Sequence, residues 1–386
     1  MRIGIIAHLK HPIAEPFSGG LEMHTHLMAR LLRERGHKVT LFASVRSDPQ
    51  LGLESICTET EMQAVGSSEA GDVPFFREHH AYLSLMNGLR HRSFDIIHNN
   101  SLHYLPVAMA DALPMPMVTT LHTPPFCWLE SGIRLCRSRQ SAIVAVSESI
   151  RSQWSHVAPI DRVILNGIDL ERFAFRPLPD SQSYLVWHGR IVREKGLHLA
   201  MEAALRVGLP LRIAGPILDE GYYRDEIRPG LGRQAQYLGH LDHKELASVV
   251  GGARAFLCTP RWDEPYGLVV AEALACGVPV AAFARGAIPE IIDRASGVLS
   301  APDDPVALAA ATLSALGLDR RACRQRAETA CDATRMIDGY EALYARMVAG
   351  RVQAGEALAI ANDLLAAPRT SIRRRTTVPA VTALSG

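Results

Sequence analysis

Residues 1–43 read MRIGIIAHLKHPIAEPFSGGLEMHTHLMARLLRERGHKVTLFA and contain one complete strand-helix-strand pattern. The short β-branched run Ile3 to Ala7 predicts a strand, and Val39 to Ala43 predicts the next one. Between them, leucines recur at helical spacing, at Leu27, Leu31 and Leu32. Because two strands that are joined by a helix commonly lie parallel in one sheet, this stretch predicts the first βαβ unit of an α/β fold.

The alternation of apolar runs and helical segments continues to about residue 350, with one interruption. At Phe173 to Ser183 the sequence loses all periodicity, which indicates a domain boundary. Further strands are predicted before it at Asp95 to His98, Val118 to Leu121, Ile143 to Val146 and Val163 to Leu165. After it they are predicted at Tyr184 to Trp187, Leu211 to Ala214, Gln236 to Leu238, Ala255 to Cys258, Val278 to Ala282 and Val298 to Leu299. We therefore expect two doubly wound α/β domains in tandem.

We place the first domain at residues 1–176 and the second at residues 177–334. Residues 335–350 form the last helical segment and are expected to pack back on the first domain through an apolar face made of Tyr340, Leu343, Tyr344 and Met347. Residues 351–386 are expected to form a tail, because Thr, Ser, Pro and Ala surround the basic run Arg373 to Arg375.

The composition is that of a globular protein without a strong overall charge. Of 386 residues, 48% are hydrophobic and 21% are charged, which suffices for the cores of two domains. The 41 Lys and Arg against 40 Asp and Glu give a net charge of +1, so no nucleic-acid partner is expected. Seven scattered cysteines, and the lack of a signal-peptide core, predict reduced thiols in a cytoplasmic protein. The apolar stretch Val269 to Ala284 is interrupted by Glu272, Gly277 and Pro279 and predicts no membrane span.

Two loops, each after the first strand of a predicted domain, are suited to an anion. The first ends in Gly19 and Gly20 directly before a helix, so that backbone N–H groups face the carboxyl edge of the sheet. A long loop that needs glycine for a positive φ is the alternative explanation. The second loop, His188 to Gly196, carries Arg190 and Lys195, whose side chains suit a diphosphate, although a solvated charged loop has the same composition. The matching positions of the two loops favour an anion site.

The segment Arg261 to Val280 reads RWDEPYGLVVAEALACGVPV and carries two glutamates in different settings. Pro265 and Gly267 predict a loop that opens a helix at about Leu268. Glu264 therefore lies in the loop, whereas Glu272 interrupts an apolar helix about one turn inside it. A carboxylate buried at that position needs donors such as ligand hydroxyls, although it also complements the helix dipole.

This segment resembles the Glu-x7-Glu signature of the retaining, metal-independent GT-B glycosyltransferases, family 4 in particular. Other stretches resemble further blocks of that family in the family order: Ser18 to Glu22, Asn166 to Asp169, Gly189-Arg190 with Lys195-Gly196, Tyr237 to Gly239, and Gly286 to Glu290. The resemblance covers about residues 1 to 350. It implies a GT-B fold, in which the two Rossmann-like domains face each other across a cleft.

The resemblance also implies a role for each matching residue. Glu264, His122, Arg190 and Lys195 would be the catalytic residues, with Arg190 and Lys195 neutralising the departing diphosphate and His122 contacting the donor sugar. The donor would be bound by Gly19, Gly20, Arg190, Lys195, Tyr266, Gly267, Leu268 and Glu272, with Glu272 accepting from the ribose hydroxyls. Tyr266 and His188 are mild departures from the family pattern and bear on the choice of donor.

The implied activity is hexosyl transfer (EC 2.4) from a UDP-, GDP- or ADP-sugar to an acceptor hydroxyl, with retention of configuration. No Asp-x-Asp motif is present, so neither a metal nor any cofactor besides the donor is expected. The acceptor is left open among a saccharide, a lipid and a small molecule. A non-catalytic GT-B partner subunit and a sugar-nucleotide epimerase are the alternative functions.

Three histidines and one basic helix end each have more than one explanation. His24 and His26 point to different helix faces and are expected to be surface or hydrogen-bonded core residues instead of zinc ligands. His98 ends a strand at the cleft side, where either an acceptor contact or a structural hydrogen bond would explain it. The basic helix end Arg30 to Lys38 is compatible with peripheral contact at the inner face of a membrane and equally with an ordinary solvated face.

Overall fold

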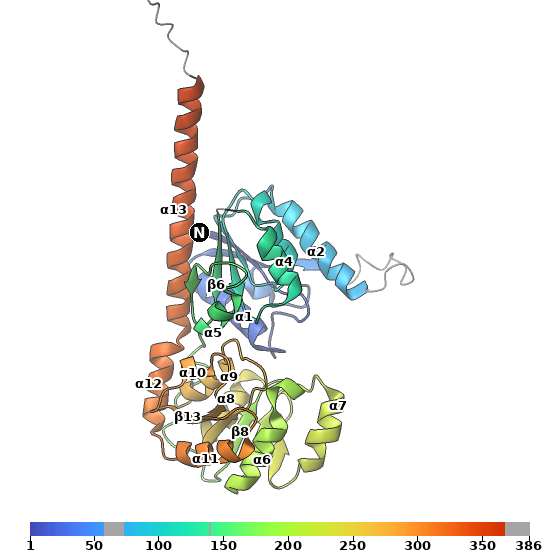
Figure 1. Cartoon of the computed structure of the whole chain (residues 1–386), viewed down its shortest axis with the longest axis vertical. Helices are drawn as coiled ribbons and strands as arrows, with labels where there is room; N and C mark the ends of the chain where they lie inside the picture. Colours follow the sequence, from blue (N-terminus) through green and yellow to red (C-terminus); the bar gives the residue numbers. More distant parts are fainter. Residues whose placement is uncertain (58–72, 139, 367–386) are drawn as a thin grey trace, which may run out of the picture.

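The computed structural model describes residues 1–57, 73–138 and 140–366 and consists of two α/β lobes, one above the other in Figure 1. The first lobe contains a parallel seven-stranded sheet in the order β3-β2-β1-β4-β5-β6-β7. Its strands are β1 (Arg2–Ile6), β2 (Lys38–Ser44), β3 (Leu53–Cys57), β4 (Ile96–Asn99), β5 (Met117–Leu121), β6 (Ser141–Ala145) and β7 (Arg162–Val163). In the central pairing, Ile3 lies opposite Val39 on one side and Ile96 on the other.

The second lobe contains a parallel six-stranded sheet in the order β10-β9-β8-β11-β12-β13. Its strands are β8 (Leu185–His188), β9 (Leu211–Ala214), β10 (Ala235–Tyr237), β11 (Ala255–Cys258), β12 (Val280–Phe283) and β13 (Gly297–Ser300). Both orders reverse direction beside the first strand of the lobe, which is where doubly wound sheets bind ligands.

Helices cover both sheets. Those of the first lobe are α1 (Gly20–Glu34), α2 (Val73–Leu89), α3 (Tyr104–Ala108), α4 (Cys127–Leu135) and α5 (Glu148–Trp154). Those of the second lobe are α6 (Leu197–Val207), α7 (Glu220–Tyr222), α8 (His243–Gly252), α9 (Leu268–Ala275), α10 (Ile288–Ile291) and α11 (Pro305–Ala315). The chain then continues through α12 (Arg320–Ala330) into the long α13 (Ala333–Ala366).

Every strand that the apolar runs predict is present within one or two residues, and one strand was missed. β3 reads LESIC, in which Glu54 and Ser55 interrupt the apolar run. It pairs only with β2 and lies at the edge of the sheet, so one of its sides faces no other strand. An edge strand needs fewer apolar residues than a central strand of a parallel sheet, which explains why the hydrophobic pattern did not reveal it.

Helix α13 returns the chain to the first lobe. Tyr340, Leu343 and Tyr344 lie in one core cluster with Ile3 and Ile5 of β1. Figure 1 shows α13 running along the first lobe and beyond it. Residues 351–366, for which the sequence predicts a tail, continue this helix. The remainder of the predicted tail, with the basic run at residues 373–375, lies outside the described residues.

Two segments of the chain connect the lobes, and these two segments contact each other. Ile168 forms a parallel bridge with Asp332, next to the start of α13. A Cβ atom on Gly167 would lie 2.6 Å from the Ala333 nitrogen, so this approach requires glycine. The Asn166-to-Asp169 block therefore holds the two crossing points together.

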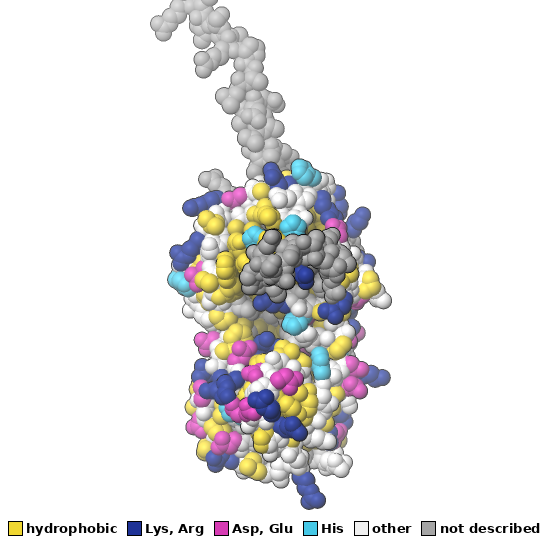
Figure 2. Space-filling model, turned by 90° about the vertical axis from the view of Figure 1, so that its right-hand side faces the viewer, with side chains coloured by type: hydrophobic (Ala, Val, Ile, Leu, Met, Phe, Trp, Pro, Cys, Tyr) yellow, Lys and Arg dark blue, Asp and Glu magenta, His cyan; other side chains and the backbone are white. Residues whose placement is uncertain are grey.

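Among the described residues, no helix combines the length and apolar character that crossing a membrane requires. Two arginines of the basic end of α1 are paired with carboxylates within the molecule. Arg30 pairs with Glu34 and Asp169, and Arg35 pairs with Asp338 and Glu341 of α13. This side of α1 thus lies against α13. On a different face of the molecule, the one shown in Figure 2, charges of both signs are interspersed.

Candidate active site

A cavity of about 640 Å³ lies between the carboxyl edges of the two sheets. All predicted site residues line it: Gly19, Gly20, His122, Arg190, Lys195, Glu264, Tyr266, Gly267, Leu268 and Glu272. Loops from both lobes thus bring together residues as far apart in the sequence as Gly19 and Glu272, as expected for the crevice of facing doubly wound sheets. Figure 2 shows the junction between the two lobes from the side.

The glycine loop brings the start of α1 close to the start of α9 across the cavity. A Cβ atom on Gly20 would lie 2.8 Å from Leu268 Cδ1, and one on Gly19 would lie 3.0 Å from Glu22 Oε2. The φ of Gly19 is −171°, which is extended backbone, so the alternative that this glycine supplies a positive φ is wrong. Close packing against the side-chain ends of Glu22 and Leu268, and not a left-handed backbone, distinguishes these two glycines. Two helix N-termini, with their unpaired N–H groups, consequently face the same space, which favours a bound anion.

The two predicted cations stand in different surroundings. Lys195 Nζ lies 2.6 Å from Glu264 Oε2 and 5.1 Å from the centre of the Trp262 ring. Arg190 pairs with the exposed Glu194 at 3.1 Å. Lys195 therefore has a partner inside the cleft, whereas the partner of Arg190 lies outside it.

Glu264 is held by contacts from several loops. Its Oε2 accepts from Lys195 and, at 3.0 Å, from Trp262 Nε1. Its backbone carbonyl accepts from the Ala287 nitrogen at 2.8 Å. Gly286 has φ +55°, and a Cβ atom there would lie 2.3 Å from the Glu264 nitrogen, so only glycine allows this packing. The carboxylate is consequently fixed in orientation before any ligand binds.

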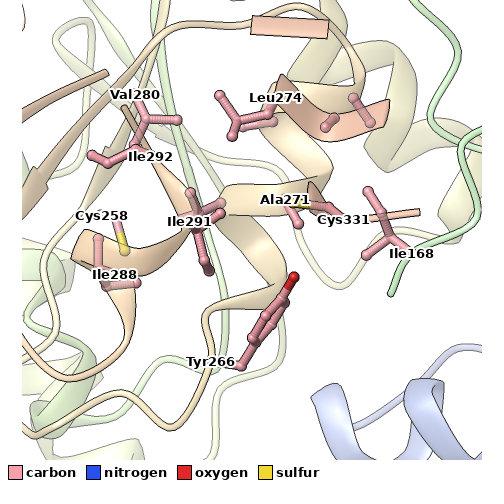
Figure 3. Close-up of a cluster of buried hydrophobic side chains, with 14 of the residues drawn as sticks. Ile168, Cys258, Tyr266, Ala271, Leu274, Val280, Ile288, Ile291, Ile292 and Cys331 are labelled. Atoms are coloured by element: carbon pink, nitrogen blue, oxygen red, sulfur yellow. The ribbon is translucent and has the colours of Figure 1, made fainter. Parts of the chain in front are cut away.

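The loop between Glu264 and α9 is anchored to both lobes. Tyr266 is buried, and Figure 3 shows its phenol pointing toward Ala271 and Cys331, which belong to the same cluster of buried hydrophobic side chains. The Pro265 carbonyl accepts from Ser147 Oγ of the first lobe at 2.7 Å. The predicted donor contacts of residues 266–268 can thus come only from their backbone, because the side chain of Tyr266 is turned into the core.

Glu272 lies at the floor of the cleft and is buried. Burial raises the pKa of its carboxyl to about 8 and lowers the pKa of the neighbouring His188 to about 3. His188 Nε2 and Glu272 Oε2 lie 3.4 Å apart but thus form no ion pair at neutral pH. Among the described residues, Nε2 has no hydrogen-bond partner. A buried ring nitrogen without a partner is costly, and a ligand hydroxyl at the cleft floor, between His188 and Glu272, would satisfy it.

We expect the stability of the ligand-free protein to report this burial. Because the pKa of Glu272 is raised from 4.5 to about 8, its contribution to stability is complete below pH 4.5 and is lost as the pH rises through 8. Glu272→Gln stays neutral, so it should melt near the wild-type temperature at pH 5 and several degrees above it at pH 9. Thermal melts across this range measure the difference, with the exposed Glu202→Gln as control. A constant difference at every pH would contradict the burial of a titrating carboxyl.

His122 follows β5 and is held by a residue that the sequence did not indicate. Its Nε2 lies 2.8 Å from Asn100 Oδ1, and its ring meets that of His24 at 4.8 Å. Burial and the nearby histidines hold the pKa of His122 well below 6.5. The imidazole is thus neutral. Because its Nε2–H donates to Asn100 Oδ1, Nδ1 carries no proton and can accept a hydrogen bond.

The other weighed histidines occupy structural positions. His98 contacts Tyr344 of α13 and Thr120, the latter at 2.9 Å, and is fully buried, so the structural hydrogen bond is the correct explanation. His26 pairs with Asp48 at 3.1 Å. The sequence predicts that His24 is a surface or hydrogen-bonded residue. Instead it is buried, and neither ring nitrogen has a hydrogen-bond partner among the residues that the structure describes. Within the described residues, no cluster of three metal-ligating side chains is present.

Sequence reasoning missed Trp262, Asn100 and the pair of His8 with Glu22. The last two side chains lie 3.0 Å apart and are both buried beside the glycine loop. Asn100 follows β4 as His122 follows β5, and His8 lies two residues after β1, so their signal is a polar residue just after a buried strand. That signal is common to many loops, and only the adjacency of the strands gives it meaning.

Comparisons with known proteins identify the family to which the chain belongs. A model of glycosyltransferase family 4 matches residues 18–172, and a model of glycosyl transferases group 1 matches residues 170–330. The chain belongs to the group 1 GT-B glycosyltransferases. It is thus an enzyme of sugar transfer, as the sequence predicted, and its two lobes are the paired Rossmann-like domains of that fold.

Curated relatives of this glycosyltransferase are similar over most of their length. The glycogen synthase of Mycobacterium tuberculosis H37Rv is 29% identical over 357 residues, covering 81% of this chain and 86% of the relative. The phosphatidyl-myo-inositol mannosyltransferase of Mycolicibacterium smegmatis is 27% identical over 343 residues, covering 83% and 86%. Among solved structures, Anabaena HepE in complex with UDP and glucose superposes with a TM-score of 0.68 at 18% identity, over 90% of this chain and 100% of HepE.

Proposed function

We propose that this glycosyltransferase moves a hexose from a nucleoside diphosphate sugar to an acceptor hydroxyl, with retention of configuration and without a metal ion. The observation that carries the proposal is the convergence of Lys195, Arg190 and the N-termini of α1 and α9 on one cavity. Glycosyl transfer must stabilise the negative charge that grows on the leaving diphosphate, and fixed cations and N–H groups supply this. HepE, a structural neighbour, binds UDP and glucose, which supports a donor of this type.

Each predicted residue has a place in this reaction. Glu272 accepts from the ribose hydroxyls at the cleft floor, and the backbone at residues 266–268 donates to the phosphates. Glu264, oriented by Lys195 and Trp262, faces the sugar on which positive charge develops. Neutral His122 approaches the sugar from the first lobe. Retention follows the family resemblance, and the carboxylates are assigned no covalent intermediate.

The direct test incubates the full chain with UDP-, GDP- or ADP-sugars and a panel of saccharide, lipid and small-molecule acceptors. Release of nucleoside diphosphate together with a new glycoside supports transfer, and NMR of the anomeric proton reports retention. Conversion of the donor into an epimer would indicate the epimerase function. Donor binding without any turnover would instead indicate a binding subunit.

We expect activity to survive removal of divalent metals. The cations Arg190 and Lys195 and the helix N-termini already neutralise the diphosphate, so EDTA should leave the rate within about twofold of the untreated enzyme. The measurement is the initial rate with excess EDTA, and again after added Mg²⁺ or Mn²⁺. A strict requirement for added metal would refute this part of the proposal.

A further inference from the structure

An aromatic wall lines the first-lobe side of the cleft, whereas Lys195, Glu264 and Glu272 belong to the second lobe. It consists of Trp128 in the first turn of α4, Tyr104 at the start of α3 and Phe75 in α2. The Trp128 ring is stacked on that of Tyr104, with 5.6 Å between centres and planes at 28°, and lies 5.3 Å from that of Phe75. Figure 1 shows α2 and α4 on the same side of the first lobe.

Folding does not account for the position of Trp128. Its side chain is 53% exposed and belongs to none of the core clusters, whereas Trp154 and Trp187 are buried. Leaving a tryptophan half exposed forgoes the free energy that its burial would give. Exposed aromatic surface inside a concave site is typical of ligand contact.

Polar groups share the cavity with the aromatic wall and restrict the chemistry of a ligand that fills it. Glu78 of α2 and Lys10 of the loop after β1 line the same cavity. Burial raises the pKa of the Glu78 carboxyl, which shows that it is partly withdrawn from water. A hydrocarbon chain on this wall would leave both groups without partners, at a cost in free energy. A ligand with one apolar face and hydroxyl groups at its edge would satisfy the rings and the polar groups together.

A pyranose ring has this combination. Its axial C–H groups form a face with slight positive charge that suits the negative face of an aromatic ring, and its hydroxyls lie around the edge. The wall is continuous with the donor residues Lys195 and Glu264 in one cavity, so a sugar stacked on it would share a single space with the donor.

We propose that the exposed indole of Trp128, which Tyr104 and Phe75 support from behind, stacks against a pyranose ring of a saccharide acceptor, whose hydroxyls Glu78 and Lys10 bind. The inference rests on the proposed function and extends it, because it selects a saccharide among the acceptor classes that the sequence left open.

Binding of methyl glycopyranosides of glucose, mannose and galactose, in the presence of saturating UDP, tests the proposal by saturation-transfer NMR. At least one glycoside should bind, with Kd on the order of 1–10 mM. Trp128→Ala should raise that Kd about tenfold, and Trp128→Tyr, which keeps a flat ring, should stay within about threefold. Leu135→Ala is the matched control, because Leu135 ends the same helix and is 61% exposed.

UDP affinity, measured by calorimetry, should be equal in all variants, because Trp128 belongs to the first lobe, whereas Lys195, Glu264 and Glu272 belong to the second. Unchanged glycoside affinity in Trp128→Ala, or no binding of any glycoside, would overturn the proposal. So would binding to phosphatidylglycerol vesicles that depends on Trp128 and competes with the glycosides. Glycoside binding that depends on Trp128 in a chain that binds no UDP, GDP or ADP would instead contradict the proposed function and leave the stacking site intact.

Discussion

Glu264→Gln is expected to lower turnover by on the order of 10²-fold or more while nucleoside diphosphate affinity stays unchanged or becomes slightly tighter. The amide keeps the shape of the carboxylate but loses the charge that would stabilise the cationic sugar in the transition state. It also releases Lys195, whose ammonium is held 2.6 Å from the carboxylate in the ligand-free protein. The freed cation is then available to the diphosphate alone.

Calorimetry with UDP and GDP, together with single-turnover rates, separates these effects. Glu272→Gln is the matched comparison, since it changes the other glutamate of the segment in the same way. That variant should weaken the nucleoside diphosphate as well as the intact donor, because Glu272 would contact the ribose that both ligands share. Equal loss of nucleotide affinity in the two variants, with no loss of thermal stability in either, would refute this division of roles.

Lys195→Ala is expected to weaken UDP or GDP binding by about 10- to 100-fold, and Arg190→Ala by less. A charge-assisted hydrogen bond contributes about 1.5–3 kcal/mol, which sets the scale. The two variants should differ because Lys195→Ala leaves the Glu264 carboxylate without its cation inside the cleft, where it repels the diphosphate. Arg190→Ala leaves behind only the exposed Glu194, which water solvates.

The double variant Lys195→Ala with Glu264→Gln measures this coupling. Removing the repelling carboxylate should restore part of the affinity that Lys195→Ala loses, so the two changes will not be additive. Arg193→Ala is the control, because Arg193 lies in the same loop but pairs with Glu226, away from the cleft residues. Unchanged nucleotide affinity after loss of both Arg190 and Lys195 would show that the diphosphate site is elsewhere.

Local patterns in the sequence were sufficient for the strands of this fold apart from the edge strand β3. Central strands of parallel sheets are buried on both faces, so runs such as Ile3 to Ala7 and Ala255 to Cys258 are continuous and easy to recognise. The loop at Pro265 and the helix that starts at Leu268 likewise follow from nearby residues, and they place Glu264 and Glu272 in different settings. The function of these positions came from a set of motifs in the family order, which the comparisons confirm as far as the family and the enzyme class.

The sequence by itself therefore determined two α/β lobes, the loops that face the cleft and the residue types they carry. Only the tertiary structure decided that Lys195 pairs with Glu264, that Gly20 lies against Leu268 and that Asn100 orients His122. These partners are separated by 69, 248 and 22 positions, and no local periodicity connects them. Secondary structure depends on neighbours a few residues away, whereas such contacts depend on how the two sheets order their strands and face each other.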